Sequence, residues 1–458
     1  MNDSWSGLLY LISALCFILA LKGLSGPKTA RNGNLIGAAG AVLAVVVVLT
    51  SEELDHLPWI FGAIAVGTVV GVPAARQVQM TAMPQLVAAF NGVGGGAAAL
   101  VALGDFLRSG DTDGYAPLTA TVFTVLIGAV SFTGSAVTFA KLQEIMTTRP
   151  VILPAGRWVS LGTAAAAVAL AVAVIPSRSV AALVALAIVA GVLGVLFVLP
   201  VGGADVPIVI SLLNAFTGLS VAASGYVLDN VLLLIAGTLV GAAGTLLTRL
   251  MAQAMGRPLA NILFGAFTAT PVTSADATGA GGPVRSVTPE DVAILLGYAR
   301  RVVVVPGYGL AVAQAQHTVH ELGDLLAARG VEVIYGIHPV AGRMPGHMNV
   351  LLAEANVDYA SLHEMDQVNG ELPSTDVALV VGANDVVNPA ARDSPGSPIY
   401  GMPIVNVDEA AQVVFLKRSM RPGFAGIDNA LLHHPKTAML FGDAKDSLTA
   451  VVAEVKAL

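Results

Sequence analysis

Long apolar runs dominate the first 250 residues of the chain. Each is long enough to cross about 30 Å of hydrocarbon as a helix that rises about 1.5 Å per residue. Buried helices of a large soluble protein are the alternative, but so many runs with so few charges favour a membrane. We therefore predict a polytopic α-helical membrane domain over residues 1–266, with about nine spans near 5–22, 34–51, 57–73, 83–103, 118–140, 158–175, 180–199, 207–227 and 231–250.

The pattern changes after residue 266. Residues 267–289 are rich in Thr, Ser, Gly and Pro, which predicts a flexible linker. Residues 290–458 alternate helical segments with short β-branched runs, which predicts an α/β Rossmann-like domain with a doubly wound parallel sheet. We expect helices at 311–329 and 444–458, and strands at 302–305, 331–335, 377–381, 403–407, 413–417 and 438–441.

Composition supports this division and excludes several classes of protein. Only 12% of the residues are charged, about half the fraction in ordinary soluble domains. Residues 1–270 hold 11 Lys/Arg and 10 Asp/Glu, so their charges nearly balance. Residues 271–458 hold 12 Lys/Arg and 20 Asp/Glu, so this part is acidic. A net charge of −7 argues against a nucleic-acid partner. The single Cys16 excludes a disulfide framework, and the histidines lack a metal-ligand spacing, so we expect no metal.

The charged loops predict an orientation. Odd-numbered connections carry most of the basic residues, and even-numbered ones carry only Arg108 and Arg178. By the positive-inside rule the N-terminus lies outside, and an odd number of spans places the C-terminal domain in the cytoplasm. The first apolar run lacks signal-peptide features, so we expect it to stay in the bilayer. The basic residues at the odd connections are Lys22, Lys28, Arg31, Arg76, Lys141, Arg149 and Arg157.

Three polar residues in or beside the spans are candidates for a proton path, because polar groups are costly in lipid. Asn91 precedes a glycine-rich stretch, and Asn214 lies in the middle of the eighth span. Both amides fit either a hydrated interior or simple hydrogen bonding between helices. Asp205 lies at the predicted cytoplasmic mouth of the eighth span, where it fits a helix N-cap, a channel carboxylate, or both.

A nucleotide site is indicated where the first predicted strand of the C-terminal domain ends. Gly307-Tyr308-Gly309 opens a helix there, as in dinucleotide-binding turns. The motif is incomplete, because Val312 replaces the third glycine and no carboxylate ends the second strand. Arg343 follows that strand instead. A cofactor with an extra phosphate, or an unusual binding pose, fits better than NAD.

Two further groups follow strands and so are expected at the same sheet edge. Lys417-Arg418-Ser419 offers an ammonium group, a planar guanidinium group and a hydroxyl, which suit a phosphate monoester. An exposed basic turn is the alternative. Asp385 follows another strand, where it fits either this crevice or an ordinary turn cap.

Seven segments of the chain together resemble one family. Residues 201–207, 213–214, 306–316, 336–355, 382–391, 417–420 and 441–445 are similar to the β subunit of bacterial proton-translocating NAD(P) transhydrogenase. The resemblance implies a bacterial inner-membrane enzyme that couples hydride transfer between NAD(H) and NADP(H) to proton movement. It implies NADP(H) on this chain in a reversed pose. NAD(H) would bind a separate α subunit that adds further spans, in a dimer of α/β units.

The resemblance also implies roles for individual residues. Lys417, Arg418 and Ser419 would hold the 2′-phosphate, and Gly423-Phe424 would form a lid. No catalytic residue is expected, because hydride passes directly between the nicotinamides. Asn91, Asp205, Asn214 and Asp385 would serve the proton path and coupling. The implied NADP(H) contacts are Gly307, Tyr308, Gly309, Val340, Ala341, Gly342, Arg343, Met344, Pro345, Gly382, Ala383, Asn384, Asp385, Val386, Gly401, Met402, Lys417, Arg418, Ser419, Gly423, Phe424 and Asp443.

One position departs from the family pattern. Asn91 stands where several relatives carry a membrane histidine, and an amide does not titrate. We therefore expect an ionisable residue from an α-subunit helix that packs against the face at residues 92–96. The rival hypothesis is an ion transporter or channel that a nucleotide-sensing Rossmann-like domain gates, which predicts ion flux without redox turnover.

Overall fold

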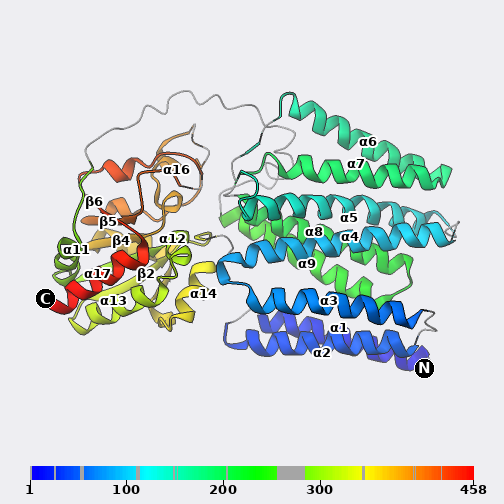
Figure 1. The fold of residues 1–458 in the computed structure, drawn as a ribbon, viewed down its shortest axis with the longest axis horizontal. Helices are drawn as coiled ribbons and strands as arrows, with labels where there is room; N and C mark the ends of the chain where they lie inside the picture. Colours follow the sequence, from blue (N-terminus) through cyan, green and yellow to red (C-terminus); the bar gives the residue numbers. More distant parts are fainter. Residues whose placement is uncertain are drawn as a thin grey trace.

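The computed structural model divides into a bundle of long helices and an α/β domain at one end of it (Figure 1). Much of the predicted linker lies outside the described residues. Near its end, Arg285 and Val287 exchange backbone hydrogen bonds with Met439, so the chain joins the sheet there. The structure describes residues 3–24, 27–51, 56–109, 114–147, 150–151, 153–202, 205–254, 284–342, 346–395, 397, 399–423 and 425–458.

Nine helices in the described part of the chain are long and apolar enough to cross a membrane, which confirms the predicted spans. The N-terminus lies at the end of the bundle away from the sheet (Figure 1). The nine helices are α1 (Asp3–Leu24), α2 (Pro27–Ser51), α3 (Leu57–Gln77), α4 (Met83–Ser109), α5 (Tyr115–Leu142), α6 (Gly156–Ser177), α7 (Val180–Val198), α8 (Val206–Val227) and α9 (Val231–Ala254).

Small residues let the central helices approach closely. A Cβ atom added to Gly218 of α8 would lie 2.4 Å from the backbone nitrogen of Gly241 in α9, so glycine is required where these two helices cross. Helix α5 packs against α4, α7 and α8, while α1 pairs with α2 and touches α9. Helices α4, α5, α8 and α9 thus form the middle of the bundle.

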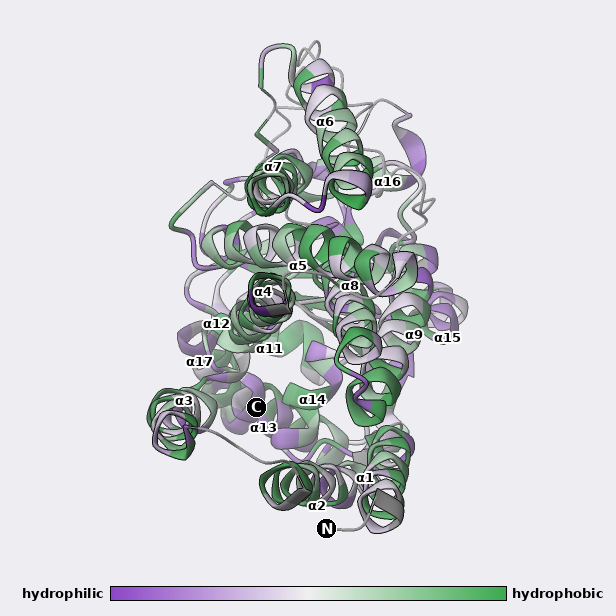
Figure 2. Cartoon of the chain, turned by 90° about the vertical axis from the view of Figure 1, so that its right-hand side faces the viewer, coloured by the Kyte–Doolittle hydropathy of each residue, from purple (hydrophilic) through white to green (hydrophobic). Residues whose placement is uncertain are grey.

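Helix α3 stands apart from this bundle. None of its residues is buried, and Trp59 is 78% exposed. Figure 2 shows α3 at one side of the chain, apart from the central helices. Lipid covers such a surface without cost, and a helix of another chain covers it equally well.

The α/β domain holds one six-stranded parallel sheet in the order β3-β2-β1-β4-β5-β6, the order of a doubly wound Rossmann fold. This confirms the predicted fold class. Alternate residues of each strand enter two separate cores: Val302 and Val304 face one side, and Val303 and Val305 the other. The strands are β1 (Arg301–Pro306), β2 (Glu332–Ile337), β3 (Leu362–Glu364), β4 (Val377–Val381), β5 (Gln412–Lys417) and β6 (Thr437–Phe441).

Helices cover both faces of the sheet. The core on one side takes residues from α11, α12, α13, α14 and α17, and the core on the other side takes residues from α15. These helices are α11 (Pro289–Gly297), α12 (Tyr308–Val312), α13 (Gln316–Ala328), α14 (His347–Glu354), α15 (Met365–Glu371) and α17 (Ala444–Ala457).

Three sequence predictions about this domain were wrong. Residues 403–407 form no strand in the described sheet; Val405 instead donates one backbone hydrogen bond to Val386. The short strand β3 was missed. The single helix predicted at 311–329 is divided between α12 and α13, because Gln314 adopts a left-handed conformation with φ of 50°.

Candidate functional site

A cavity of about 640 Å³ opens at the carboxyl edge of the sheet, between the paired strands β1 and β4, after which the chain continues toward opposite edges of the sheet. This is the switch point at which open α/β sheets bind ligands. The loops after β1, β2, β4, β5 and β6 all reach it. Its lining includes these residues predicted from the sequence: Gly307, Tyr308, Gly309, Val340, Ala341, Gly342, Gly382, Ala383, Asn384, Asp385, Val386, Met402, Lys417, Arg418, Ser419, Gly423 and Asp443.

The five remaining predicted contacts are not among the described residues that line the cavity. Gly401 precedes Met402 but does not line the cavity, whereas Arg343, Met344, Pro345 and Phe424 are outside the described residues. Sequence reasoning missed two informative lining residues, Leu142 and Pro207. Arg421, which also lines the cavity, lies in the segment 417–424 that the resemblance places around NADP(H). No local pattern places Leu142 or Pro207 there, because both come from the membrane bundle.

Glycines bring the turn after β1 against the turn after β4. Gly307 donates its backbone N–H to Val381 O at 2.9 Å, and Gly309 donates to Gly382 O at 2.9 Å. A Cβ added to Gly307 would lie 2.4 Å from the Cα of Ala383, and Gly382 has φ of 67°. Side chains are therefore excluded here, and backbone forms the wall of the cavity.

Cationic side chains gather after β5. Lys417 Nζ donates to Arg421 O at 2.7 Å and to Asn384 Oδ1 at 3.3 Å. Burial lowers the pKa of Lys417, while the charges of Asp385 and Asp428 oppose that shift. Arg418 and Arg421 are exposed, and Arg421 Nε donates to Ser419 Oγ at 3.3 Å. Two guanidinium groups, an ammonium and a hydroxyl thus face one region, an arrangement that suits a phosphate.

Asp385 holds a neighbouring segment over the cavity. Its Oδ2 accepts a hydrogen bond from the backbone N–H of Ala425 at 2.8 Å, and its Oδ1 accepts one from Asn384 Nδ2 at 3.1 Å. A Cβ added to Gly423 would lie 2.5 Å from Asp385 Oδ1. The carboxylate therefore fixes the segment on both sides of the predicted lid residue Phe424.

His338 joins two loops of the site. Its Nε2 lies 2.8 Å from Pro403 O, and its Nδ1 accepts the backbone N–H of Val340 at 3.2 Å. These partners fit the neutral ring with its proton on Nε2. Burial lowers the pKa of His338 to about 4. The loop that carries Val340 is thus tied to the residue after Met402.

The membrane bundle and the α/β domain share an apolar cluster. Val209 and Leu212 of α8 belong to it, and so do Ile399, Met402 and Ile404 of the α/β domain. Met402 also lines the cavity. The segment at 399–404 therefore has one side on the bundle and one on the candidate site.

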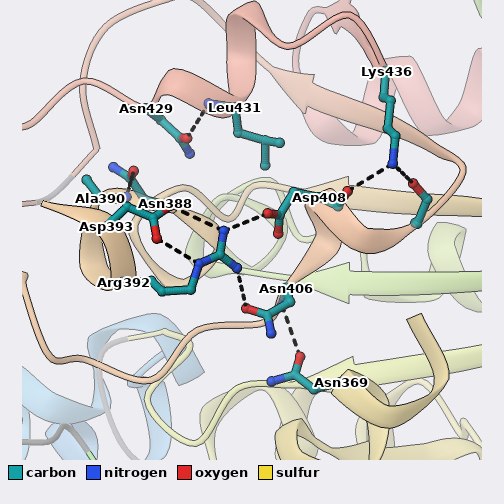
Figure 3. A network of polar contacts seen from close by, with 11 residues as sticks. Asn369, Asn388, Ala390, Arg392, Asp393, Asn406, Asp408, Asn429, Leu431 and Lys436 are labelled. Atoms are coloured by element: carbon teal, nitrogen blue, oxygen red, sulfur yellow. Dashed lines mark hydrogen bonds and ion pairs between the residues drawn. The ribbon is translucent and has the colours of Figure 1, made fainter. Parts of the chain in front are cut away.

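A charged network joins residues that precede this segment to residues that follow it (Figure 3). Arg392, in helix α16 (Ala390–Asp393), donates to Asp393 Oδ1 at 3.0 Å and to Asp408 Oδ2 at 2.8 Å. It also reaches Asn406 Oδ1 at 3.3 Å. The neighbouring carboxylates raise the pKa of Arg392, so the guanidinium stays charged. Asn406 directly precedes the short 3-10 helix η6 (Val407–Glu409), which contains Asp408 and lies next to β5.

Inside the bundle, Asn91 belongs to a polar seam, which we define as Asn91, Ser131, Ser135 and Thr217. Asn91 Nδ2 donates to Ser135 Oγ at 2.9 Å and to Ser131 Oγ at 3.3 Å. The hydroxyls of Ser131 and Thr217 are 2.6 Å apart. The seam joins α4, α5 and α8, and sequence reasoning missed its two serines.

The other two membrane candidates lie outside this seam. Asn214 is half-buried on α8 and makes no hydrogen bond with a described residue through its side chain. Asp205 occupies the N-cap position of α8, but its carboxylate makes no capping hydrogen bond to the described first turn. Asp205 therefore stands at the predicted N-cap position, but its side chain does not cap the helix.

The glycine-rich face of α4 is not available to a partner. A Cβ added to Gly92 would lie 3.1 Å from Ser135 Cβ, and one added to Gly95 would lie 3.0 Å from Ser131 Cβ. Helix α5 occupies this face, so the expectation that an α-subunit helix packs there is wrong. The exposed side of α4 carries Val93 and Leu100 instead.

Fold and site together define a multi-pass membrane bundle joined to a Rossmann-like domain with a dinucleotide-type cavity. A family model described as NAD(P) transhydrogenase beta subunit matches residues 6–454. Two Rhodospirillum rubrum proteins are named NAD(P) transhydrogenase subunit beta, one of them from a defined strain. Each is 45% identical to this chain over 461 residues. The match covers 99% of both chains. The chain belongs to the NAD(P) transhydrogenase beta subunit family.

Family membership confirms the relationship predicted from the sequence segments. The chain is one component of a proton-translocating transhydrogenase, an enzyme that works with an alpha subunit, and it is a multi-pass membrane protein. The rival hypothesis of a nucleotide-gated transporter without redox activity is not supported by this membership.

Proposed function

We propose that this chain binds NADP(H) in the cavity at the switch point and couples its hydride exchange to proton movement through the bundle. The observation that carries the proposal is the group of Lys417, Arg418, Ser419 and Arg421 around one end of that cavity. This charge suits the extra phosphate that distinguishes NADP(H) from NAD(H). NAD(H) then binds the alpha subunit.

The residues present fit such a cofactor. The backbone at Gly307 and Gly382 forms a wall that a planar ring or a phosphate can approach closely, and Met402 adds an apolar surface. When bound, the nicotinamide supplies or accepts the hydride. The chain binds and orients the cofactor, and Asp385 holds the segment around Gly423 so that water is excluded. No protein acid or base is required for the hydride step.

The assembly and orientation follow as parts of the same proposal. The alpha subunit adds spans that pack on α3 and on the exposed side of α4, and two α/β units form a dimer. The chain lies in the bacterial inner membrane with its N-terminus outside. Residues 1–266 form the proton-translocating domain, 267–289 the linker and 290–458 the cytoplasmic NADP(H)-binding domain.

Reconstitution with the alpha subunit tests this function. In sealed vesicles, we expect hydride transfer from NADPH to an NAD⁺ analogue, accompanied by a pH gradient that an uncoupler abolishes. Neither subunit alone should transfer hydride. If this chain alone conducted ions on NADPH addition, and the pair showed no redox turnover, the transporter hypothesis would replace the proposal.

A further inference from the structure

A buried lysine at the end of α5 holds the connection that follows α7. Lys141 is 1% exposed, and its Nζ donates to Leu199 O at 2.6 Å, Val201 O at 2.7 Å and Val198 O at 3.2 Å. An ammonium group has three N–H donors, so all of them are used. A buried charge is tolerated only when it is paired or fully hydrogen-bonded. The geometry of these carbonyls therefore depends on Lys141.

Both ends of this contact continue into the wall of the candidate nucleotide cavity. Leu142 follows Lys141 and lines the cavity, and its carbonyl accepts Gln85 Nε2 at 3.2 Å. After the three acceptor carbonyls, the chain reaches Asp205 and then Pro207, which lines the same cavity. Lys141, which does not itself line the cavity, thus links the chain beside Leu142 to the connection that leads to Pro207.

The same helices lead in the other direction to the polar seam. Ser131 lies on α5 roughly three turns before Lys141, and Thr217 lies on α8 roughly three turns after Pro207. Their hydroxyls are 2.6 Å apart. A change in the cavity wall that moves α8 relative to α5 would therefore alter the seam as well.

Simple capping of α7 is the alternative role. Lysine side chains often bind the last carbonyls of a helix. Capping accounts for the bonds to Val198 and Leu199, where α7 ends, but Val201 lies beyond the helix. The bond to Val201 fixes the connection itself, which leads to Asp205.

We propose that Lys141 is a positioning residue for coupling, which holds the connection at 199–202 so that the nucleotide cavity and the first turn of α8 move together. The proposal rests on the proposed function, because coupling has meaning only if the cavity binds NADP(H). Lys141 itself does not contact the reacting atoms.

The experiment uses the complete enzyme with its alpha subunit in sealed vesicles. Lys141→Met removes the three N–H donors but keeps a side chain of similar length, and Lys141→Arg keeps a cationic side chain. Arg157→Met is the matched control, since Arg157 is an exposed cation at the start of α6, over the Trp158 ring. Two reactions are compared: NADPH-driven proton translocation, and hydride exchange between NADH and an NAD⁺ analogue through bound NADP(H).

We expect Lys141→Met to lower proton-linked turnover at least tenfold and to leave hydride exchange within twofold of the unaltered enzyme. Lys141→Arg should retain most proton-linked turnover, and Arg157→Met all of it. If Lys141→Met translocated the same number of protons per hydride transferred as the unaltered enzyme, the proposal would be overturned. Equal loss of both reactions, which indicates a purely structural role, would overturn it as well. An unaltered enzyme inactive in both reactions would instead refute the proposed function.

A measurement on the unaltered enzyme guards against a variant that does not fold. Hydrogen exchange at 199–202 should differ between the NADP⁺-bound and NADPH-bound enzyme, and exchange in α3 should not. Identical exchange at 199–202 in both states would also overturn the proposal.

Discussion

At the residue scale, the two neighbouring cations after β5 have different surroundings. Lys417 is half-buried and bonded to Arg421 O, so it also shapes the turn. Arg418 is exposed at the rim of the cavity. We infer that Arg418 provides a phosphate contact, while Lys417 contributes charge and holds the turn in shape.

The first prediction concerns nucleotide specificity. Replacing both Lys417 and Arg418 by Ala should weaken NADPH binding by about 1.5–3 kcal/mol per lost charged hydrogen bond, and leave NADH binding nearly unchanged. Isothermal titration calorimetry measures both affinities. Lys456→Ala is the control, because Lys456 pairs with Glu321 away from the cavity. Equal weakening of both nucleotides would contradict the phosphate site.

The second prediction concerns the pH dependence set by His338. In the folded protein the pKa of His338 is about 4, below the ordinary value of 6.5. As the pH falls, the imidazole is therefore protonated in the unfolded chain before it is protonated in the folded protein. Stability should therefore decrease from pH 6.5 toward pH 4, by about 1.4 kcal/mol per pH unit. His338→Gln keeps one donor and one acceptor but does not titrate.

Calorimetric unfolding of both proteins at about pH 7.5 and about pH 5.5 measures this difference. The unaltered protein should lose more stability on acidification than His338→Gln does. The same loss in both proteins would show that other groups control the pH dependence.

At the scale of elements, α5 connects the parts of the molecule that function requires. It carries Ser131 and Ser135 of the polar seam, and Lys141 and Leu142 at the cavity end. Its glycine-packed contact with α4 fixes Asn91 against these serines. No histidine occurs in the nine spans found among the described residues.

The third prediction follows from Asn91, whose amide orients water but does not exchange a proton as an imidazole does. An ionisable residue on an alpha-subunit span should complete the path near the seam. Replacing each histidine or carboxylate of those spans in turn should identify one whose loss abolishes proton translocation in vesicles. If translocation survives every replacement, a path through water alone becomes the better account.

At the scale of the whole molecule, the α/β domain has two cores of its own, and its contact with the bundle is a third cluster. The buried residues of the first two all lie beyond position 291, and Val284 and Val287 pack against them. A domain with its own core is expected to fold alone.

The fourth prediction is that residues 284–458 fold in water and bind NADPH. Exposure of Ile399 and Ile404, which the bundle covers in the full chain, should lower solubility but not prevent folding. Circular dichroism tests whether the fragment folds, and calorimetry tests whether it binds NADPH. An insoluble fragment, or a soluble one that does not bind NADPH, would refute the proposed domain division.

The spans were predictable from the residues alone, because lipid requires each crossing segment to be long and apolar. The sequence also predicted most strands and many cavity residues, since loops after parallel strands meet at one edge. It mispredicted 403–407, where Ile404 packs against the bundle and Val405 and Val407 enter a core of the sheet domain without pairing as a strand.

The contacts between distant segments became visible only in the folded chain. Lys141 resembles an ordinary loop charge in the sequence, yet it is buried on carbonyls some sixty residues away. The face at Gly92 was predicted to receive a partner, yet α5 fills it. Leu142 and Pro207 reach the nucleotide cavity only because the bundle and the sheet pack end to end. Such contacts depend on the packing of whole elements, which no local pattern of residues encodes.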